Sequence, residues 1–175
     1  MITEHSIYIG ASQHMTFTED NSIDLVVTSP PYPMIEMWDD VMSSQNHRIS
    51  DNLEENPEEA FELMHQELDK VWKECFRVLK IGGFLCINIG DATRTIKGNF
   101  TLYNNHSRIS KACVDLGFVG LPNIIWGNRQ MHPISLWVVV CCLVGHMLRL
   151  NMNGYLYSAK VANESSRRLM RNLAE

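Results

Sequence analysis

The feature that most constrains this chain is an apolar stretch that stops at two prolines, residues 23–32 (Ile-Asp-Leu-Val-Val-Thr-Ser-Pro-Pro-Tyr). Its β-branched residues are typical of a buried strand. Pro30 and Pro31 lack an N–H and have a fixed φ, so they end the hydrogen-bonded ladder and form a stiff corner. Open α/β sheets bind ligands at such strand ends, although a purely structural turn would have the same sequence.

Sequence patterns around this stretch predict alternating strands and helices. Asn56-Pro57-Glu58-Glu59 is a strong helix start, because Asn caps, Pro suits the first helical position and acids favour the helix dipole. We expect strands at 6–10, 23–28, 84–89 and 121–126, helices at 57–79 (closed by Gly82-Gly83) and 106–116 (closed by Gly117), and loops at 33–50 and 91–104. This order predicts an α/β fold, a parallel sheet with flanking helices.

Composition narrows the class of protein. A chain of 175 residues with 45% hydrophobic and 20% charged residues is typical of one soluble globular domain. The five cysteines show no C-x-x-C pair and the seven histidines are scattered singly, so no metal site is expected. Without a signal peptide, these cysteines indicate reduced thiols in a cytoplasmic protein.

Charge is unevenly distributed along the chain. Residues 1–126 hold nine Lys/Arg against eighteen Asp/Glu, whereas residues 127–175 hold six against two. Affinity for nucleic acid comes mostly from Lys and Arg meeting phosphates. If the protein acts on DNA, its basic contact surface must therefore lie outside the acidic main body.

Several segments, in order, resemble the amino-methylating DNA methyltransferases, which modify cytosine N4 or adenine N6. Their catalytic motif, [Ser/Asn/Asp]-Pro-Pro-Tyr after a buried strand, is here Ser29-Pro30-Pro31-Tyr32. The resemblance extends over about residues 5–126, through the segments 77–83, 90–91, 105–109, 116–118 and 124–126. It implies a partial Rossmann-like methyltransferase fold that uses S-adenosylmethionine and acts on double-stranded DNA. The Ser variant of the motif favours cytosine N4 over adenine N6.

The resemblance also implies roles for individual residues. An exocyclic base amine is a poor nucleophile, and acceptors at Ser29 Oγ and the Pro30 carbonyl, braced by Pro31, can release its lone pair. The target base must flip out of the duplex, and Tyr32 and Trp126 offer rings for stacking, although Trp126 suits a core position equally well.

Three further positions carry the expected cofactor contacts. Gly10 stands where the family has a Gly-Asp-Ser type turn, so Gly10 and Ala11 are expected to line the S-adenosylmethionine pocket. Ala11 replaces the acid that is usual there. Asp91 either orients the cofactor or a loop, or caps a turn.

One expected motif is missing from the sequence. The family's glycine-rich cofactor turn, Phe-x-Gly-x-Gly, does not occur. We therefore expect residues 1–126 to be the catalytic half of a methyltransferase domain, inactive alone or completed by a chain that carries the cofactor and target-recognition motifs.

Residues 127–175 form an unusual tail. Residues 131–148 contain no Lys, Arg, Asp or Glu, and residues 135–144 are almost continuously apolar. The uncharged stretch 131–148 is borderline in length for a membrane span. A membrane-anchored, non-enzymatic protein is therefore one alternative. We favour a frameshift product instead, because codons for 127–141 can be chosen so that another frame encodes a polar, lysine-bearing segment. A methyltransferase acting on RNA or a protein amide is the remaining alternative.

Overall fold

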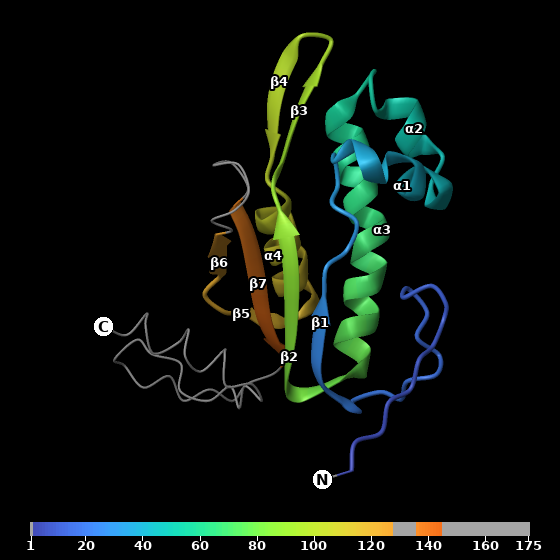
Figure 1. Cartoon of the computed structure of the whole chain (residues 1–175), viewed down its shortest axis with the longest axis vertical. Coiled ribbons are helices and arrows are strands. Elements are labelled where there is room, and N and C mark those ends of the chain that lie inside the picture. The colour runs from blue at the N-terminus through green and yellow to red at the C-terminus, as the bar shows by residue number, and fades with distance from the viewer. Residues whose placement is uncertain (1, 128–135, 145–175) are drawn as a thin grey trace, which may run out of the picture.

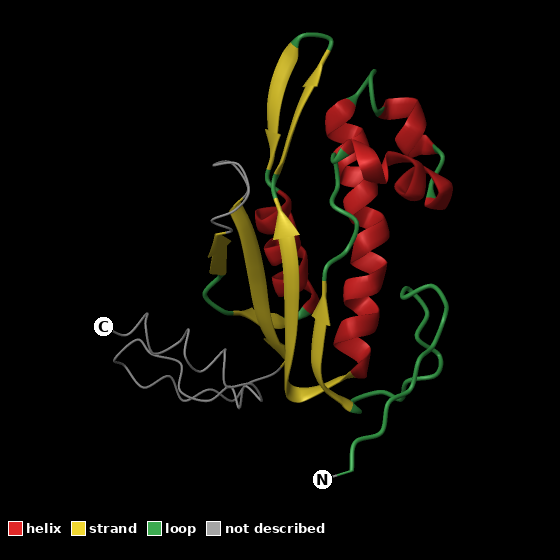
Figure 2. Ribbon diagram, in the orientation of Figure 1, coloured by secondary structure: helices red, strands yellow, loops and turns green. Residues whose placement is uncertain are grey.

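A parallel pair of strands joined by a 22-residue helix organises the fold (Figures 1 and 2). The computed structural model describes residues 2–127 and 136–144. Its elements are, in chain order, β1 (Ile23–Thr28), η1 (Glu36–Trp38), α1 (Asp39–Gln45), α2 (Arg48–Asn52), α3 (Pro57–Val78), β2 (Leu79–Gly90), β3 (Ala92–Ile96), β4 (Asn99–Tyr103), α4 (Asn105–Leu116), β5 (Phe118–Gly120), β6 (Ile124–Gly127) and β7 (Leu136–Val144).

The predicted helix start is confirmed at α3. The Asn56 side chain accepts a hydrogen bond from the Glu59 backbone N–H, and Pro57 occupies the first helical turn. The C-terminal cap of α4 is also confirmed, because Gly117 follows the helix at φ +107°. Only glycine adopts that left-handed conformation without a steric penalty, so both boundaries are set by local chemistry.

The expected role of Gly82-Gly83 as the cap of α3 is wrong. The helix ends at Val78, and both glycines lie inside β2, where Gly82 has φ +85°. The β1–β2 register slips here, because Ile23 pairs with Leu79 whereas Leu25 pairs with Phe84. Glycine is required at 83, where a Cβ would lie 2.9 Å from the Lys80 carbonyl oxygen.

The sheet is mixed: it contains the parallel pairing expected from the sequence together with antiparallel pairs. Its strand order is β1-β2-β7-β5, with β6 also paired to β7. Among the described strands, only β1 and β2 pair in parallel, and β7 pairs antiparallel with β2, β5 and β6. The strand expected at 121–126 is β6, and the apolar run of the tail forms β7 inside the sheet. The remaining tail residues, 128–135 and 145–175, lie outside the described residues.

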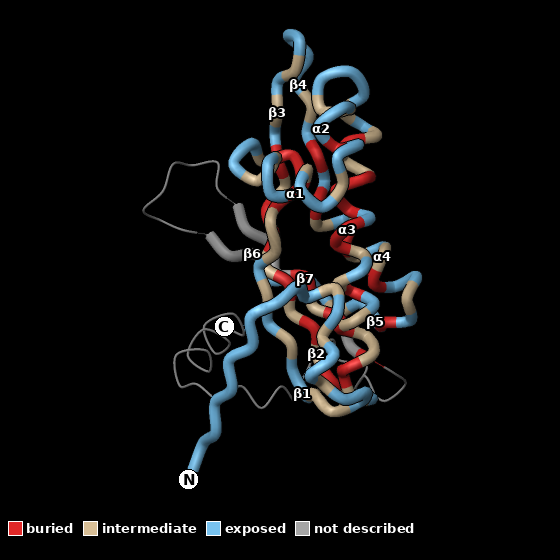
Figure 3. The backbone as a smooth tube through the Cα atoms, turned by 90° about the vertical axis from the view of Figure 1, so that its right-hand side faces the viewer, coloured by how far each residue is buried: buried red, intermediate tan, exposed pale blue. Residues whose placement is uncertain are grey.

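The core lies between one face of the sheet and helices α3 and α4 (Figure 3). Alternate residues of β2 point into it, Leu85, Ile87 and Ile89, each 0% exposed. Trp72 of α3 and Ile109 of α4 are equally buried against them. The α/β fold expected from the sequence is therefore confirmed, with both long helices packed on the same face.

Three segments differ from the sequence-based expectation. Residues 33–50 contain short helices instead of a loop, because buried Met42 and Ile49 pack into the core. Residues 92–103 form the β3–β4 hairpin, whose turn has positive φ at Lys97 and Gly98. Residues 6–10 form no strand, because no other described segment pairs with them. No helix among the described residues is long and apolar enough to cross a membrane.

Candidate functional site

The candidate site is the edge of the sheet where β1 and β2 end. The two strands are parallel, with Thr28 opposite Ile87, so their carboxyl ends meet at one edge. Ser29–Tyr32 follows β1 there, and Gly90-Asp91 closes β2. Two segments that lie about 60 residues apart in the sequence thus meet where open α/β sheets place their ligands.

Ser29 and Tyr32 are brought together as expected. The Ser29 Oγ lies 3.1 Å from the Tyr32 hydroxyl, while Ser29 itself is exposed and Tyr32 is 9% exposed. Burial raises the pKa of Tyr32, and the hydrogen bond with Ser29 opposes that shift. The phenol therefore stays protonated at neutral pH, and its hydroxyl holds the Ser29 side chain at the corner.

Asn88, a residue that the sequence analysis missed, completes this group. It lies on β2, and its Nδ2 is 3.4 Å from the Tyr32 hydroxyl. Its Oδ1 is buried and has no hydrogen-bond partner among the described residues. A buried acceptor without a partner is costly, so Asn88 is a natural contact for a donor group at this edge. The sequence signal that could have identified Asn88 is its position as a polar residue inside the apolar run 84–89.

Asn105 is a second missed residue, and it fixes the position of the corner. Its side chain is fully buried and donates to the Pro33 and Gly90 carbonyls, at 3.1 and 3.0 Å. Its Oδ1 lies 3.0 Å from Nε2 of His65 on α3. One amide thus ties the segment after β1 to the end of β2 and to the core helix.

Asp91 adopts the capping role that the sequence left open. Its Oδ1 accepts a hydrogen bond from the His106 backbone N–H in the first turn of α4, at 3.2 Å. Both carboxylate oxygens also lie 2.8 Å from His106 Nδ1. The carboxylate is therefore engaged in positioning α4, and its predicted contact with a cofactor stays a prediction.

No described contact brings Gly10 or Ala11 to this edge. Gly10 and Ala11 are exposed, and a Cβ built on Gly10 would meet no heavy atom within 4 Å. Trp126 lies on β6, its backbone opposite Trp137. Gly10 and Ala11 are thus not enclosed by other described residues. The roles expected for all three residues stay predictions.

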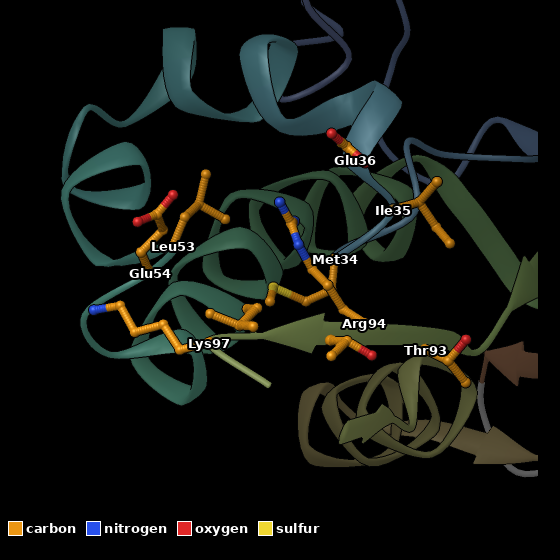
Figure 4. Close-up of a pocket in the computed structure, with 10 residues that line it drawn as sticks. Met34, Ile35, Glu36, Leu53, Glu54, Thr93, Arg94 and Lys97 are labelled. Carbon is orange, nitrogen blue, oxygen red and sulfur yellow. The ribbon is translucent and has the colours of Figure 1, made fainter. Parts of the chain in front are cut away.

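A cavity of about 540 Å³ lies next to the corner, between the β3–β4 hairpin and the short helices (Figure 4). It begins at Met34, two residues after the motif, and Arg94 extends across it to form a two-pronged ion pair with Asp39. The volume suits a small organic group. Its lining residues are Met34, Ile35, Glu36, Leu53, Glu54, Thr93, Arg94, Thr95, Ile96 and Lys97. They include none of the predicted site residues.

Among residues 2–127 and 136–144, no group of three His, Cys, Asp or Glu side chains is placed to hold an ion. The groups present at the corner are hydroxyls, amides and carbonyls, which suit hydrogen bonding to a polar substrate.

Comparison with solved structures supports the fold. TTHA0409 of Thermus thermophilus, described as a DNA modification methylase, is 26% identical, with a TM-score of 0.57. The match covers 87% of this chain and 56% of that one. Its complex with S-adenosyl-L-methionine gives a TM-score of 0.58 at the same identity, over 87% and 57% of the two chains. The chain therefore adopts part of a Rossmann-like methyltransferase fold.

Two curated relatives are more similar in sequence. The type II methyltransferase M.MjaI of Methanocaldococcus jannaschii is 46% identical over 75% of this chain and 47% of its own length. M.MthZI of Methanothermobacter thermautotrophicus is 48% identical over 76% of this chain and 38% of its own. The chain thus spans about half, or less, of the relatives it matches. The N6_N4_Mtase family model, a DNA methylase, matches residues 23–151, and the chain belongs to this N6/N4 DNA methylase family.

Proposed function

We propose that this chain is the catalytic half of a DNA methyltransferase that transfers a methyl group to N4 of a flipped cytosine in double-stranded DNA. Adenine N6 is the alternative target. The methyl donor in this proposal is S-adenosylmethionine, whose sulfonium supplies the chemical driving force. Since the chain spans about half of its curated relatives, we propose that these 175 residues are inactive until the rest of the fold joins them.

The observation that carries the proposal is the Ser29–Tyr32 corner at the shared edge of β1 and β2. Ser29 Oγ and the Pro30 carbonyl accept the two hydrogens of the exocyclic amine, which localises the nitrogen lone pair for attack on the methyl group. S-adenosylhomocysteine would leave as the other product, and the methylated nitrogen would release one proton to solvent. Tyr32 holds the Ser29 hydroxyl at 3.1 Å, so little reorganisation is needed. The ring of Tyr32, and that of Trp126, are the proposed stacking surfaces for the flipped base.

The buried amide of Asn88 supports the same use of this edge. Its Oδ1 has no hydrogen-bond partner among the described residues, lies in the cluster that holds the Tyr32 hydroxyl and can accept a hydrogen bond from the incoming base. The acidic balance of residues 1–126 opposes tight binding of DNA by this half alone. We therefore place the main phosphate contacts in the remainder of the protein.

A methylation assay tests the proposal. The chain would be fused to the portion of M.MjaI that it does not span and expressed in a host without DNA methyltransferases. Mass spectrometry of the hydrolysed DNA then separates N4-methylcytosine from N6-methyladenine. N4-methylcytosine is expected, N6-methyladenine would establish the alternative, and unmodified DNA from a folded, cofactor-binding fusion would refute the proposal.

A variant pair links the activity to the corner. Ser29→Ala removes one acceptor and is expected to lower the methylation rate by roughly 100-fold. Ser44→Ala removes an exposed hydroxyl of α1 and should leave the rate unchanged. Equal rates for both variants would show that Ser29 does not act on the amine.

The frameshift hypothesis for residues 127–175 stays a prediction. Residues 136–144 have a place in the sheet as β7, and the family match extends to residue 151. Sequencing the coding DNA tests the hypothesis, since an alternative frame past residue 126 must then continue the methyltransferase pattern.

A further inference from the structure

Two cysteines from distant parts of the chain lie opposite each other in the sheet. Cys86 belongs to β2 and Cys141 to β7, and the two residues are direct partners in the antiparallel register. Their sulfur atoms are 3.8 Å apart, although the residues are 55 positions apart in the sequence. Successive residues of a strand point to opposite faces, so the neighbouring Cys142 points away from this pair.

The backbone at this pair already suits a disulfide. Directly opposite residues of an antiparallel pair have Cα atoms about 4.5–5.5 Å apart, and disulfides join Cα atoms that are about 4.4–6.8 Å apart. A bridge requires the two sulfurs to approach from 3.8 Å to about 2.05 Å. Rotation of the two side chains covers that difference, so the strands keep their register.

These two thiols also differ from the other cysteines in exposure. Cys86 and Cys141 are partly exposed, on the face of the sheet turned away from α3 and α4. Cys75, Cys113 and Cys142 are at most 2% exposed. Burial raises the pKa of Cys75 to about 12, whereas a hydrogen bond from the Cys141 thiol lowers the pKa of Cys86 to about 7. Because the thiolate is the nucleophile, Cys86 combines access with reactivity.

We propose that Cys86 and Cys141 form a thiol-modification site, at which a small-molecule disulfide of the glutathione class converts the two thiols into a reversible bridge between β2 and β7. The sequence led us to expect five reduced thiols, and the structure distinguishes these two from the other three. The bridge would attach the apolar run of the tail covalently to the strand that ends at the candidate site. This inference does not depend on methyl transfer.

The modification proceeds in two steps. The Cys86 thiolate attacks one sulfur of oxidised glutathione, which forms a mixed disulfide and releases the other half as a thiolate. Cys141 then loses its proton to solvent, and its thiolate attacks the Cys86 sulfur and releases the second glutathione thiolate. Two protein thiols are thus oxidised to one disulfide, one small disulfide is reduced to two thiols, and the released thiolates take up the two protons.

The pair lies close to the candidate site. Asn88 follows Cys86 by two residues on β2, so its side chain is on the same face, about 7 Å further along the strand. That amide is the group that contacts the Tyr32 hydroxyl. Since the bridge would be partly exposed, a reducing thiol can reach it and restore both cysteines.

Mass spectrometry of the purified 175-residue chain tests the proposal. The chain is incubated with oxidised glutathione at neutral pH, alkylated and digested with trypsin, which yields the peptides 81–94 and 130–149. We expect these two peptides to be linked through Cys86 and Cys141, as assigned by fragmentation, and to separate after treatment with dithiothreitol. A link through Cys142, a link between other cysteines, or two unmodified thiols would overturn the inference.

Single substitutions separate the two steps. Cys141→Ser removes the second thiol and should leave a stable glutathione adduct on Cys86, whereas Cys86→Ser should abolish both the adduct and the bridge. Cys142→Ala is the matched control next to Cys141 and should form the bridge at the natural rate. Circular dichroism confirms that each variant folds. Modification of Cys141 at the natural rate in the Cys86→Ser chain would contradict the proposed order of steps.

Alkylation by iodoacetamide measures the reactivity on which the first step depends. In the folded, reduced chain, Cys86 should react at least about tenfold faster than buried Cys75. In concentrated urea the two rates should converge, because the difference is due to the fold. Equal rates in the folded chain would refute the assignment of Cys86 as the attacking thiol.

Discussion

Acid is expected to destabilise this protein through one buried histidine, His65 of α3. Its side chain is fully buried, and Nε2 lies 3.0 Å from Asn105 Oδ1, so Nε2 carries the proton and donates it. Its Nδ1 is buried without a partner among the described residues. Burial is the main cause that lowers the pKa of His65 from 6.5 to about 4, and the nearby Arg108 cation adds to it.

The magnitude follows from the difference between the two pKa values. The unfolded chain takes up a proton near pH 6.5, whereas the folded protein resists protonation down to about pH 4. The stability due to neutral His65 is therefore present above pH 6.5 and is lost as the pH falls below it. Between pH 7 and pH 5 the loss is about 2 kcal/mol, and by pH 4 it approaches about 3 kcal/mol.

Urea unfolding at pH 7 and pH 5 measures this loss. Carboxylates paired with arginines do not add to the change in this pH range. The pKa values of Glu62 and Glu74 are lowered from 4.5, so the stability that these two ion pairs provide is lost only at lower pH. His65→Gln should remove most of the pH dependence, whereas His47→Gln, at an exposed position, should retain it. Equal free energies of unfolding for the natural chain at the two pH values would refute the reasoning.

Three substitutions probe the supports of the site by urea unfolding. Asn105→Ala leaves two carbonyls and an imidazole N–H without partners and should lower the free energy of unfolding by about 3 kcal/mol. The exposed Asn104→Ala should lower it by under about 0.5 kcal/mol. Equal losses would show that the Asn105 hydrogen bonds do not hold the corner in place. Gly83→Ala brings a Cβ to 2.9 Å from a carbonyl oxygen and should cost about 1–3 kcal/mol, whereas Gly120→Ala, with 3.7 Å to its nearest neighbour, should cost less. Arg108→Met breaks ion pairs to two α3 carboxylates and should lower the free energy of unfolding by about 1–2 kcal/mol. An unchanged urea midpoint would show that these half-buried ion pairs do not stabilise the fold.

The sequence alone determined the parts of this protein that depend on local chemistry. The Asn56-Pro57 start of α3, the Gly117 end of α4 and the Pro30-Pro31 corner each need only a few consecutive residues, and all were predicted correctly as helix boundaries or as a strand end. The methyltransferase family was likewise readable, because its motif follows a recognisable buried strand.

Tertiary structure decided what depends on distant partners. The apolar run of the tail becomes β7 because β2, β5 and β6 pair with it, and no local pattern specifies that choice. Asn88 and Asn105 have the sequence character of ordinary polar residues, and only packing turns them into buried contacts of the corner. Residues 6–10 have a strand's pattern without a strand's structure, because a strand needs a neighbour to satisfy its backbone.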